Sequence, residues 1–176
     1  ADLRKLDLGA NRIRVMEGLS GLTNLEELWL GKNKVECIQG IENLTKLRKL
    51  DVQNNRLRRV TGLSTLANLE QLYLSHNAID STDGFENLTN LDTLDLGNNK
   101  IKTVEGLSGL TDLTDLWMGT NLVDSFDVLE PLHQLPQLSC LYLEHCPLQQ
   151  DFEYRKKLAS MFPTLEQIDA TDVIRL

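Results

Sequence analysis

One phrase, Leu-x-x-Leu-x-(Leu, Val or Met)-x-x-Asn-x-apolar, occurs six times in this chain at a constant spacing of 22 residues. The asparagines that mark it are Asn11, Asn33, Asn55, Asn77, Asn99 and Asn121. A fixed period in the twenties indicates a repeat protein, in which no repeat buries its apolar face alone and each must stack on its neighbours. We therefore expect one elongated domain instead of a globule around a central core.

The positions within the phrase predict the fold class. Its first, fourth and sixth residues, such as Leu25, Leu28 and Leu30, are apolar and point inward from a short strand that pairs in parallel with its neighbours. Between the phrases, apolar residues recur every three positions, as a 3₁₀ turn requires. The pattern predicts an α/β solenoid of the leucine-rich-repeat type, with short parallel strands on the concave face, 3₁₀ segments on the convex face and a C-terminal helical cap.

The invariant polar positions have structural interpretations. An asparagine amide offers donors and an acceptor, enough to satisfy buried backbone groups of its own and the adjacent repeat. In the seventh repeat Cys146 takes this position, and we interpret it as a weaker polar substitute, not as a reactive thiol. A glycine precedes each convex run, where a residue without Cβ permits a sharp change of direction. These glycines are Gly18, Gly40, Gly62, Gly84 and Gly106.

The repeat register changes after the sixth repeat. From Leu113 to Leu138 is 25 residues, which leaves three extra residues, room for about one α-helical turn. We assign residues 1–150 to the repeats, six of 22 residues plus a seventh after the insertion, and residues 151–176 to a C-terminal cap. Because the first repeat begins without a polar cap, we expect the chain to be a fragment that lacks N-terminal repeats.

The cap is predicted to contain one amphipathic helix. It extends from Phe152 to Phe162, with Asp151 as its N-cap and Pro163 as its stop. A last short strand follows, in the phrase Leu-x-x-Ile-x-Ala that ends at Ala170. The helix is expected to close the apolar core at this end.

Composition narrows the class of function. The formal charge of -8 argues against nucleic acid and anionic membranes as partners and favours a basic protein surface. No apolar run approaches the roughly 20 residues of a membrane span, and no signal segment opens the chain. Three cysteines without flanking clusters indicate a reducing compartment. We expect a soluble, monomeric, intracellular protein that binds another protein.

The exposed strand positions carry the strongest functional signal. Down the stack, acid and large aromatic nearly alternate at the fifth repeat position: Asp7, Trp29, Asp51, Tyr73, Asp95, Trp117, Tyr142 and Asp169. In a chain that is only 5% aromatic, two Trp and two Tyr in one surface column indicate a binding face, because such residues are frequent interface hot spots. We predict that this column contacts a partner.

The charges beside this column differ between the two halves of the floor. In the first three repeats the signs are mixed, so neighbours such as Lys5 and Glu27 can pair across strands. Repeats four to six instead show Glu70, Asp92 and Asp115 without a base. The excess of acid favours binding at the second half of the floor.

Several phrases carry a further resemblance, and those near the C-terminus are more specific than the repeat itself. They are Tyr73-Leu74-Ser75-His76-Asn77, Trp117-Met118-Gly119-Thr120-Asn121, Tyr154-Arg155-Lys156-Lys157 and Gln167-Ile168-Asp169-Ala170-Thr171. In these phrases, and over nearly its whole length, the chain resembles the family of regulatory subunit 7 of protein phosphatase 1. The resemblance implies a non-catalytic, nuclear and cytoplasmic partner of the phosphatase catalytic subunit that controls its maturation, activity and mitotic use. The docking residues it implies are Asp7, Trp29, Asp51, Tyr73, Asp95, Asp115, Trp117 and Tyr142.

Other classes of function have less support. The three histidines are scattered, and the sequence contains no metal pair and no nucleophile with its base, so we predict no catalysis, cofactor or metal. An extracellular adhesion module and a ribonucleoprotein scaffold stay open as alternatives. The second would be supported by a basic row at the tenth repeat position, which we interpret as a solvated edge of an acidic chain. This row is Arg12, Lys34, Arg56 and Lys100.

Overall fold

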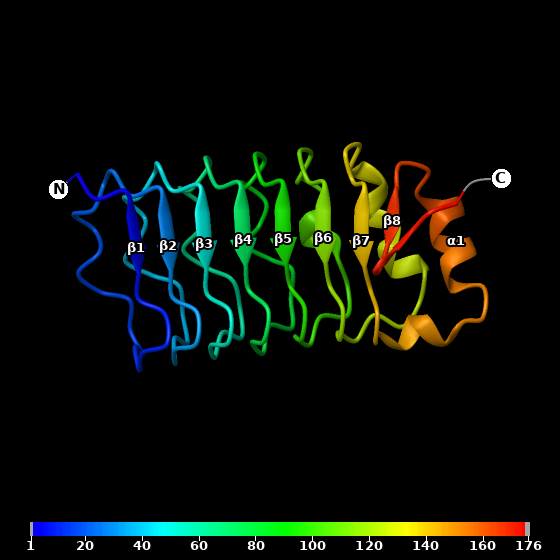
Figure 1. Cartoon of the computed structure of the whole chain (residues 1–176), viewed down its shortest axis with the longest axis horizontal. Coiled ribbons are helices and arrows are strands. Elements are labelled where there is room, and N and C mark those ends of the chain that lie inside the picture. Colours follow the sequence, from blue (N-terminus) through cyan, green and yellow to red (C-terminus); the bar gives the residue numbers. More distant parts are fainter. Residues whose placement is uncertain (1, 175–176) are drawn as a thin grey trace.

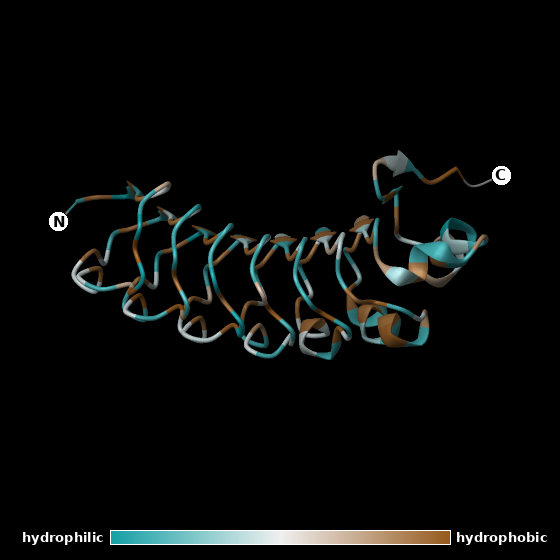
Figure 2. Ribbon diagram, turned by 90° about the horizontal axis from the view of Figure 1, so that it is seen from below, coloured by the Kyte–Doolittle hydropathy of each residue, from teal (hydrophilic) through white to brown (hydrophobic). Residues whose placement is uncertain are grey.

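In the computed structural model, residues 2–174 form a curved solenoid with its strands on the concave side (Figures 1 and 2). Within these residues nine strands make one sheet in sequence order, β1 to β8 parallel and β9 antiparallel to β8. They are β1 (Lys5–Asp7), β2 (Glu27–Trp29), β3 (Lys49–Asp51), β4 (Gln71–Tyr73), β5 (Thr93–Asp95), β6 (Asp115–Trp117), β7 (Cys140–Tyr142), β8 (Gln167–Ile168) and β9 (Thr171–Asp172). Residue 1 and the last two residues of the expected cap, 175 and 176, lie outside the described part.

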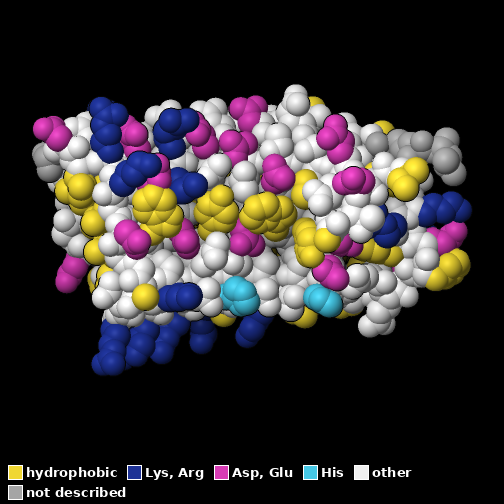
Figure 3. Space-filling view, viewed as in Figure 1, with side chains coloured by type: hydrophobic (Ala, Val, Ile, Leu, Met, Phe, Trp, Pro, Cys, Tyr) yellow, Lys and Arg dark blue, Asp and Glu magenta, His cyan; other side chains and the backbone are white. Residues whose placement is uncertain are grey.

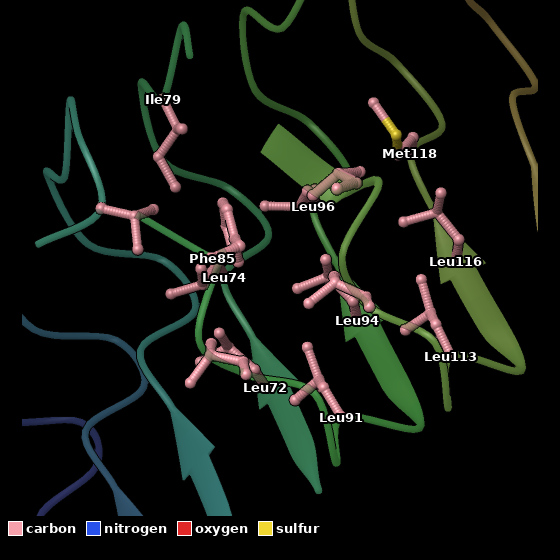
Figure 4. Packing of buried hydrophobic residues seen from close by; sticks show 14 of the residues in the cluster. Leu72, Leu74, Ile79, Phe85, Leu91, Leu94, Leu96, Leu113, Leu116 and Met118 are labelled. Carbon is pink, nitrogen blue, oxygen red and sulfur yellow. The ribbon is translucent and has the colours of Figure 1, made fainter. Parts of the chain in front are cut away.

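Every turn of the solenoid buries the same positions. The middle residue of each strand from β2 to β7 is fully buried, and Figure 4 shows Leu72, Leu94 and Leu116 of three neighbouring strands inside the stack with Phe85 from a convex turn. This core is one continuous cluster along the molecule. At the β1 end the apolar stripe is partly open, since Leu3 is 40% exposed.

The asparagine ladder has the role that the sequence predicts. The Asn33 Nδ2 atom donates to the carbonyl oxygens of Leu8 and Leu30, both at 2.9 Å, and its Oδ1 accepts the N–H of Ile13 at 2.9 Å. Each later asparagine of the ladder repeats these bonds to its own and the preceding repeat. The amides therefore join neighbouring repeats while they satisfy buried backbone groups.

Cys146 replaces the asparagine in the way expected. Its Sγ atom accepts the N–H of Asn121 at 3.4 Å and donates to the carbonyl oxygen of Met118 at 3.4 Å. Burial raises the pKa of this thiol, which disfavours the reactive thiolate. The structural interpretation of Cys146 is confirmed.

The convex side follows the predicted period of three but forms less helix than expected. The N–H of Leu22 donates to the carbonyl of Leu19, and that of Leu25 to Leu22, both at 2.9 Å. These bonds start three residues apart and not at consecutive residues, so the first four repeats, as far as the structure describes them, contain single turns and no 3₁₀ helix. The first 3₁₀ helix, η1 (Glu105–Leu107), occurs in the fifth repeat. The insertion is a 3₁₀ helix, η2 (Asp127–Gln134), so the expected α-helical turn was wrong. Its bonding is of the 3₁₀ type, since the N–H of Leu129 donates to the carbonyl oxygen of Phe126 at 2.9 Å, and Pro131 inside it has no N–H to donate.

The C-terminal helix is shorter than predicted. After a 3₁₀ helix, η3 (Pro147–Gln150), the α-helix α1 extends over Tyr154–Met161, and no helix of the described chain is long and apolar enough to cross a membrane. Asp151 caps the turn before it, where its Oδ1 accepts the N–H of Glu153 at 2.8 Å, and is not the helix N-cap. The placement of Phe152 on the apolar face was also wrong, because its side chain is 95% exposed.

Strand β9 closes the sheet and was not predicted. Its position depends on Arg155 of α1, whose guanidinium donates to the carbonyl oxygens of Ile168 at 2.6 Å, Thr171 at 3.2 Å and Asp172 at 3.3 Å. These bonds fix the helix against the last antiparallel turn. A two-residue strand held by a side chain from another element has no periodic signal in the sequence.

Candidate functional site on the concave floor

The predicted acidic and aromatic column is continuous in the structure. The strands pair without offset, so each residue of the column lies beside its counterpart in the next repeat. The order of neighbours is Asp7, Trp29, Asp51, Tyr73, Asp95, Trp117 and Tyr142. Since the middle leucine of each strand points into the core, these side chains face the concave floor, where Figure 3 shows acids and apolar rings interleaved in a row. Asp115 faces the same floor two residues before Trp117.

The floor has two hollows that divide the predicted residues. The N-terminal hollow, of about 450 Å³, is lined by Asp7, Trp29 and Asp51. The C-terminal hollow, of about 680 Å³, is lined by Asp95, Asp115, Trp117 and Tyr142. Tyr73 is in the column between the two groups and lines neither hollow. The larger hollow also contains residues that the sequence did not single out, among them His76, Cys140, Glu144, His145 and Gln167.

The aromatic rings approach each other across an intervening carboxylate. The ring centroids of Tyr73 and Trp117 are 6.4 Å apart at an interplanar angle of 43°, although strand β5 with Asp95 lies between their strands. On the other side of Tyr73, the Lys49 Nζ atom lies 5.8 Å from its ring centroid. Ring faces beside a carboxylate suit a cationic group, because the ring quadrupole and the charge attract it together.

The aspartates of the column also have a structural role that the sequence did not reveal. In Asp7, Asp51 and Asp95 the Oδ1 atom accepts the backbone N–H of the second residue after it, at 2.8, 2.8 and 2.9 Å. Such a bond fixes the turn that leaves the strand. One carboxylate oxygen is thus used by the fold, and the other is directed to the floor, where Asp95 Oδ2 accepts only a long bond of 3.4 Å from Gln53.

The closely spaced acidic side chains give the floor a negative electrostatic potential. Burial raises the pKa of Asp51, and the charges of Asp95 and Asp7 raise it further. Burial likewise raises the pKa of Tyr73, with contributions from the surrounding aspartates. The Tyr142 hydroxyl donates to Glu144 at 2.6 Å, and this bond raises the pKa of the tyrosine. Burial disfavours the charged forms of Asp51 and Tyr73, and the neighbouring carboxylates add a repulsion of further negative charge that a cationic group would relieve.

The expected excess of acid is present, with one correction. Glu70 was predicted to lack a base, but Arg48 binds it through two bonds of 2.8 Å from Nε and Nη2. Asp92 and Asp115 instead accept bonds of 2.7 Å from neighbouring threonine hydroxyls, and no ion pair involves them in the described part of the chain. The acids of the second half that have no cationic partner there are therefore Asp92, Asp95 and Asp115.

Asp169, the last residue of the predicted column, is largely buried at the edge of the C-terminal hollow. It is 8% exposed and has a left-handed backbone with φ of 53°. Its Oδ1 atom accepts the N–H of Leu143 at 2.8 Å and the hydroxyl of Tyr154 at 3.2 Å. Burial and the charge of Asp169 together raise the pKa of Tyr154. Asp169 therefore joins the cap helix to the last full repeat.

Replacing Asp169 with alanine is expected to lower the free energy of unfolding by about 2 kcal/mol, because a buried backbone N–H and a buried phenol would lose their acceptor. The loss is measured by urea unfolding followed by circular dichroism. Asp172→Ala is the matched control, since Asp172 is exposed in β9. Equal losses in the two variants would show that Asp169 does not have this role.

The three histidines occupy two different parts of the structure. His76 and His145 are on left-handed turns at the rim of the C-terminal hollow, with φ of 56° and 64°. His133 is elsewhere, with its ring nitrogens 2.9 Å from Glu130 and 3.0 Å from the carbonyl oxygen of Met161. Among residues 2–174 no group of three or more His, Cys, Asp and Glu side chains is arranged to hold a metal ion.

Comparisons with known proteins agree on the repeat architecture. An internalin from Listeria monocytogenes superposes with a TM-score of 0.82 and 27% identity over 98% of this chain and 49% of that one. A leucine-rich repeat protein from Leptospira interrogans gives 0.82 and 26% identity over 94% of this chain and 43% of that one. The predicted solenoid fold is confirmed by these likenesses.

One curated relative has a name that refers to a function. It is an Arabidopsis thaliana homologue of a protein phosphatase 1 regulatory inhibitor subunit, 46% identical over 48 residues, which are 26% of this chain and 15% of the relative. The chain thus spans a small part of this relative and just under half of the two solved structures. The family described as leucine-rich repeat region matches residues 2–175. The chain belongs to the leucine-rich repeat family.

Proposed function

We propose that this chain is a non-catalytic regulatory subunit that binds the catalytic subunit of protein phosphatase 1 through its concave floor and controls the activity or maturation of that enzyme. The single observation that carries the proposal is the continuous column of carboxylates and aromatic rings, nearly alternating, one per repeat, held in register across seven strands. The name of the plant relative suggests the identity of the proposed partner.

The floor has the dimensions of a protein interface. Eight parallel strands at about 4.8 Å spacing give a length of roughly 34 Å, which suits an interface of standard size. The two hollows provide separate places for protruding groups, and Tyr73 between them is available to both sides of the contact. A partner with basic side chains is favoured, because the acids without a cationic partner would meet opposite charges on binding.

The strongest anchors are expected in the C-terminal hollow. Trp117 and Tyr142 are neighbours in register there, with the carboxylates of Asp95 and Asp115 beside them. Hot spots are typically aromatic residues in a central pocket that a partner can desolvate fully, and the rings of this hollow have that setting. Binding energy is therefore expected to be concentrated at this end of the floor.

The proposal predicts that purified phosphatase catalytic subunit binds this chain in solution. Trp117→Ala and Tyr142→Ala should each raise the dissociation constant by about 30-fold, as truncation of a hot spot does. Isothermal titration calorimetry measures the constants, and circular dichroism verifies that each variant is folded. Phe152→Ala is the matched control, because it removes an exposed aromatic ring from the cap and should leave the constant unchanged.

The possible results distinguish a wrong partner from a wrong binding site. Absence of binding by the unaltered chain would overturn the proposed partner. Binding that survives both floor variants would retain the partner and reject the floor as its site. A ribonucleoprotein scaffold is disfavoured because the floor carboxylates would repel phosphates. In the proposed role the chain acts as a monomer in the nucleus and cytoplasm, and the chemistry is supplied by the phosphatase.

A further inference from the structure

A second charged surface lies on the edge where the chain leaves the strands. In the first three repeats, the tenth, twelfth and thirteenth repeat positions hold six cations and one acid, Glu36. We call the cations the basic ridge: Arg12, Arg14, Lys34, Arg56, Arg58 and Arg59. Figure 3 shows Lys and Arg side chains projecting together along the lower edge of the molecule, mainly over its N-terminal half. This concentration of positive charge contrasts with the formal charge of -8 of the whole chain.

The opposite edge of the same repeats has a different arrangement of charge. There the sign alternates from repeat to repeat, and the charges form close ion pairs: Arg4 with Glu26 at 3.0 Å, Lys5 with Glu27 at 2.7 Å, and Arg48 with Glu70 at 2.8 Å. On the basic ridge, the ion pairs within the described residues are Arg56 with Glu36 at 3.9 Å and Arg59 with Asp80 at 4.0 Å. One edge is thus neutralised internally, and the other stacks like charges with little compensation.

The solenoid does not need cations at the ridge. At the tenth position the backbone N–H of Arg56 donates to the preceding repeat, to Val35, at 2.8 Å. Ala78 and Leu122 make the same bond at the same position, also at 2.8 Å, with apolar side chains. The fold therefore accepts residues without charge there, and neighbouring cations repel one another. This contrast argues against a merely solvated edge.

We propose that the basic ridge binds a short acidic segment of a partner polypeptide in an extended conformation. Five of its six cations are arginines, whose planar guanidinium groups bind carboxylates through paired hydrogen bonds. Three repeats span two strand spacings, about 10 Å, which corresponds to about three residues of extended chain. The ridge therefore matches a run of a few acidic side chains.

Nucleic acid fits this surface less well. The ridge segments, residues 12–15, 34–37 and 56–59, contain no aromatic side chain on which a base could stack. Asp7 and Asp51 on the floor of the same repeats would repel a long polyanion that extended beyond the ridge. A short acidic peptide engages the cations and avoids these carboxylates.

The basic ridge and the proposed phosphatase site are different surfaces. The ridge lies at the strand exits and the aromatic column on the floor, so the two surfaces can be tested separately in one protein. The floor variant Trp117→Ala should bind an acidic peptide as the unaltered chain does. Loss of both activities in that variant would instead place the acidic peptide on the floor.

The test uses a fluorescent oligoglutamate peptide as the probe and fluorescence anisotropy at about 0.15 M ionic strength. The variant Arg12→Gln with Lys34→Gln removes two ridge charges and should weaken binding about tenfold. The matched control, Lys100→Gln with Lys102→Gln, removes two charges from the fifth repeat and should change binding less than about twofold. All four side chains are at the surface, so each variant is expected to remain folded.

Besides loss of peptide binding in the floor variant, three results would overturn the proposal. The first is absence of peptide binding by the unaltered chain, and the second is an equal loss in the ridge and control variants. The third is tighter binding of single-stranded DNA of equal charge than of the peptide, which would assign the ridge to nucleic acid. Selective loss in the ridge variant, with weaker binding of the DNA, would establish the acidic peptide as its ligand.

Discussion

Replacing Gly106 with alanine is expected to lower the free energy of unfolding by about 3 kcal/mol. A Cβ atom at Gly106 would overlap the backbone carbonyl of Thr82 in the preceding repeat. Neither group can move alone, because the Gly106 N–H is bonded to the Thr82 hydroxyl at 3.1 Å and both segments contact the buried core. The added methyl group must therefore push two repeats apart.

A matched set of glycines separates this effect from backbone strain. Gly21 has open space where an alanine methyl group would lie and no positive φ, so Gly21→Ala should be nearly neutral. Gly18 has the same open space but a φ of 73°, so Gly18→Ala reports the cost of the left-handed backbone alone, about 1 kcal/mol. Gly106 has no such φ and reports the overlap alone.

The measurement is thermal and urea unfolding of the three variants beside the unaltered chain. For a chain of this length, 3 kcal/mol corresponds to a decrease of roughly 10 °C in the melting temperature. A smaller effect at Gly106 than at Gly18 would contradict the overlap argument. It would show that neighbouring repeats can separate at little cost.

Replacing Asn99 with alanine should have the second large effect, a loss of about 3 kcal/mol. The Asn99 side chain is buried and donates to the carbonyl oxygens of Leu74 at 3.1 Å and Leu96 at 2.9 Å, while its Oδ1 accepts the N–H of Ile79 at 3.0 Å. Alanine leaves these groups without a partner away from water. It also removes a bond between two repeats, so the loss is expected in the cooperative unfolding of both.

Asn11 is the control for this prediction. It is exposed in the first repeat and donates only to Leu8 at 2.9 Å and Gly9 at 3.1 Å, both in its own repeat. Asn11→Ala should therefore cost less than about 1 kcal/mol, since water can replace these bonds. Similar losses at the two positions in urea unfolding would show that burial and the bonds between repeats are not what makes the ladder stabilising.

The fold was predictable because each repeat places the same types of residue in the same surroundings. A residue such as Leu72 and its equivalents 22 positions away have the same neighbours, so each repeat tests the assignment of the others. Apart from the convex turns, the places where the predicted fold was wrong are those that occur once. The insertion around Pro131 and the exposed Phe152 depend on local contacts, and β9 depends on bonds from Arg155. These features do not recur along the chain, so the 22-residue repeat gives no sign of them.

The floor column was predictable for the same reason, because in-register parallel strands turn a sequence column into a spatial row. Its division into two hollows was not, since a sequence column does not show how the surface is hollowed between its members. The pair of Arg48 and Glu70 had a signal that was overlooked, a separation of one repeat length. The turn bonds of the aspartates had a weaker one, the Asp-x-Gly spacing of Asp7 and Asp95.

The alternation of acid and ring on the floor makes the repeating unit of the surface twice as long as that of the scaffold. Asp7, Asp51 and Asp95 are separated by two repeats each, as are Trp29, Tyr73 and Trp117. Deleting any one of the second to fifth repeats would preserve the core and the ladder but place two acids or two further rings side by side. Deleting a pair would shorten the molecule and keep the pattern. Changes of length that conserve recognition should occur in even numbers of repeats.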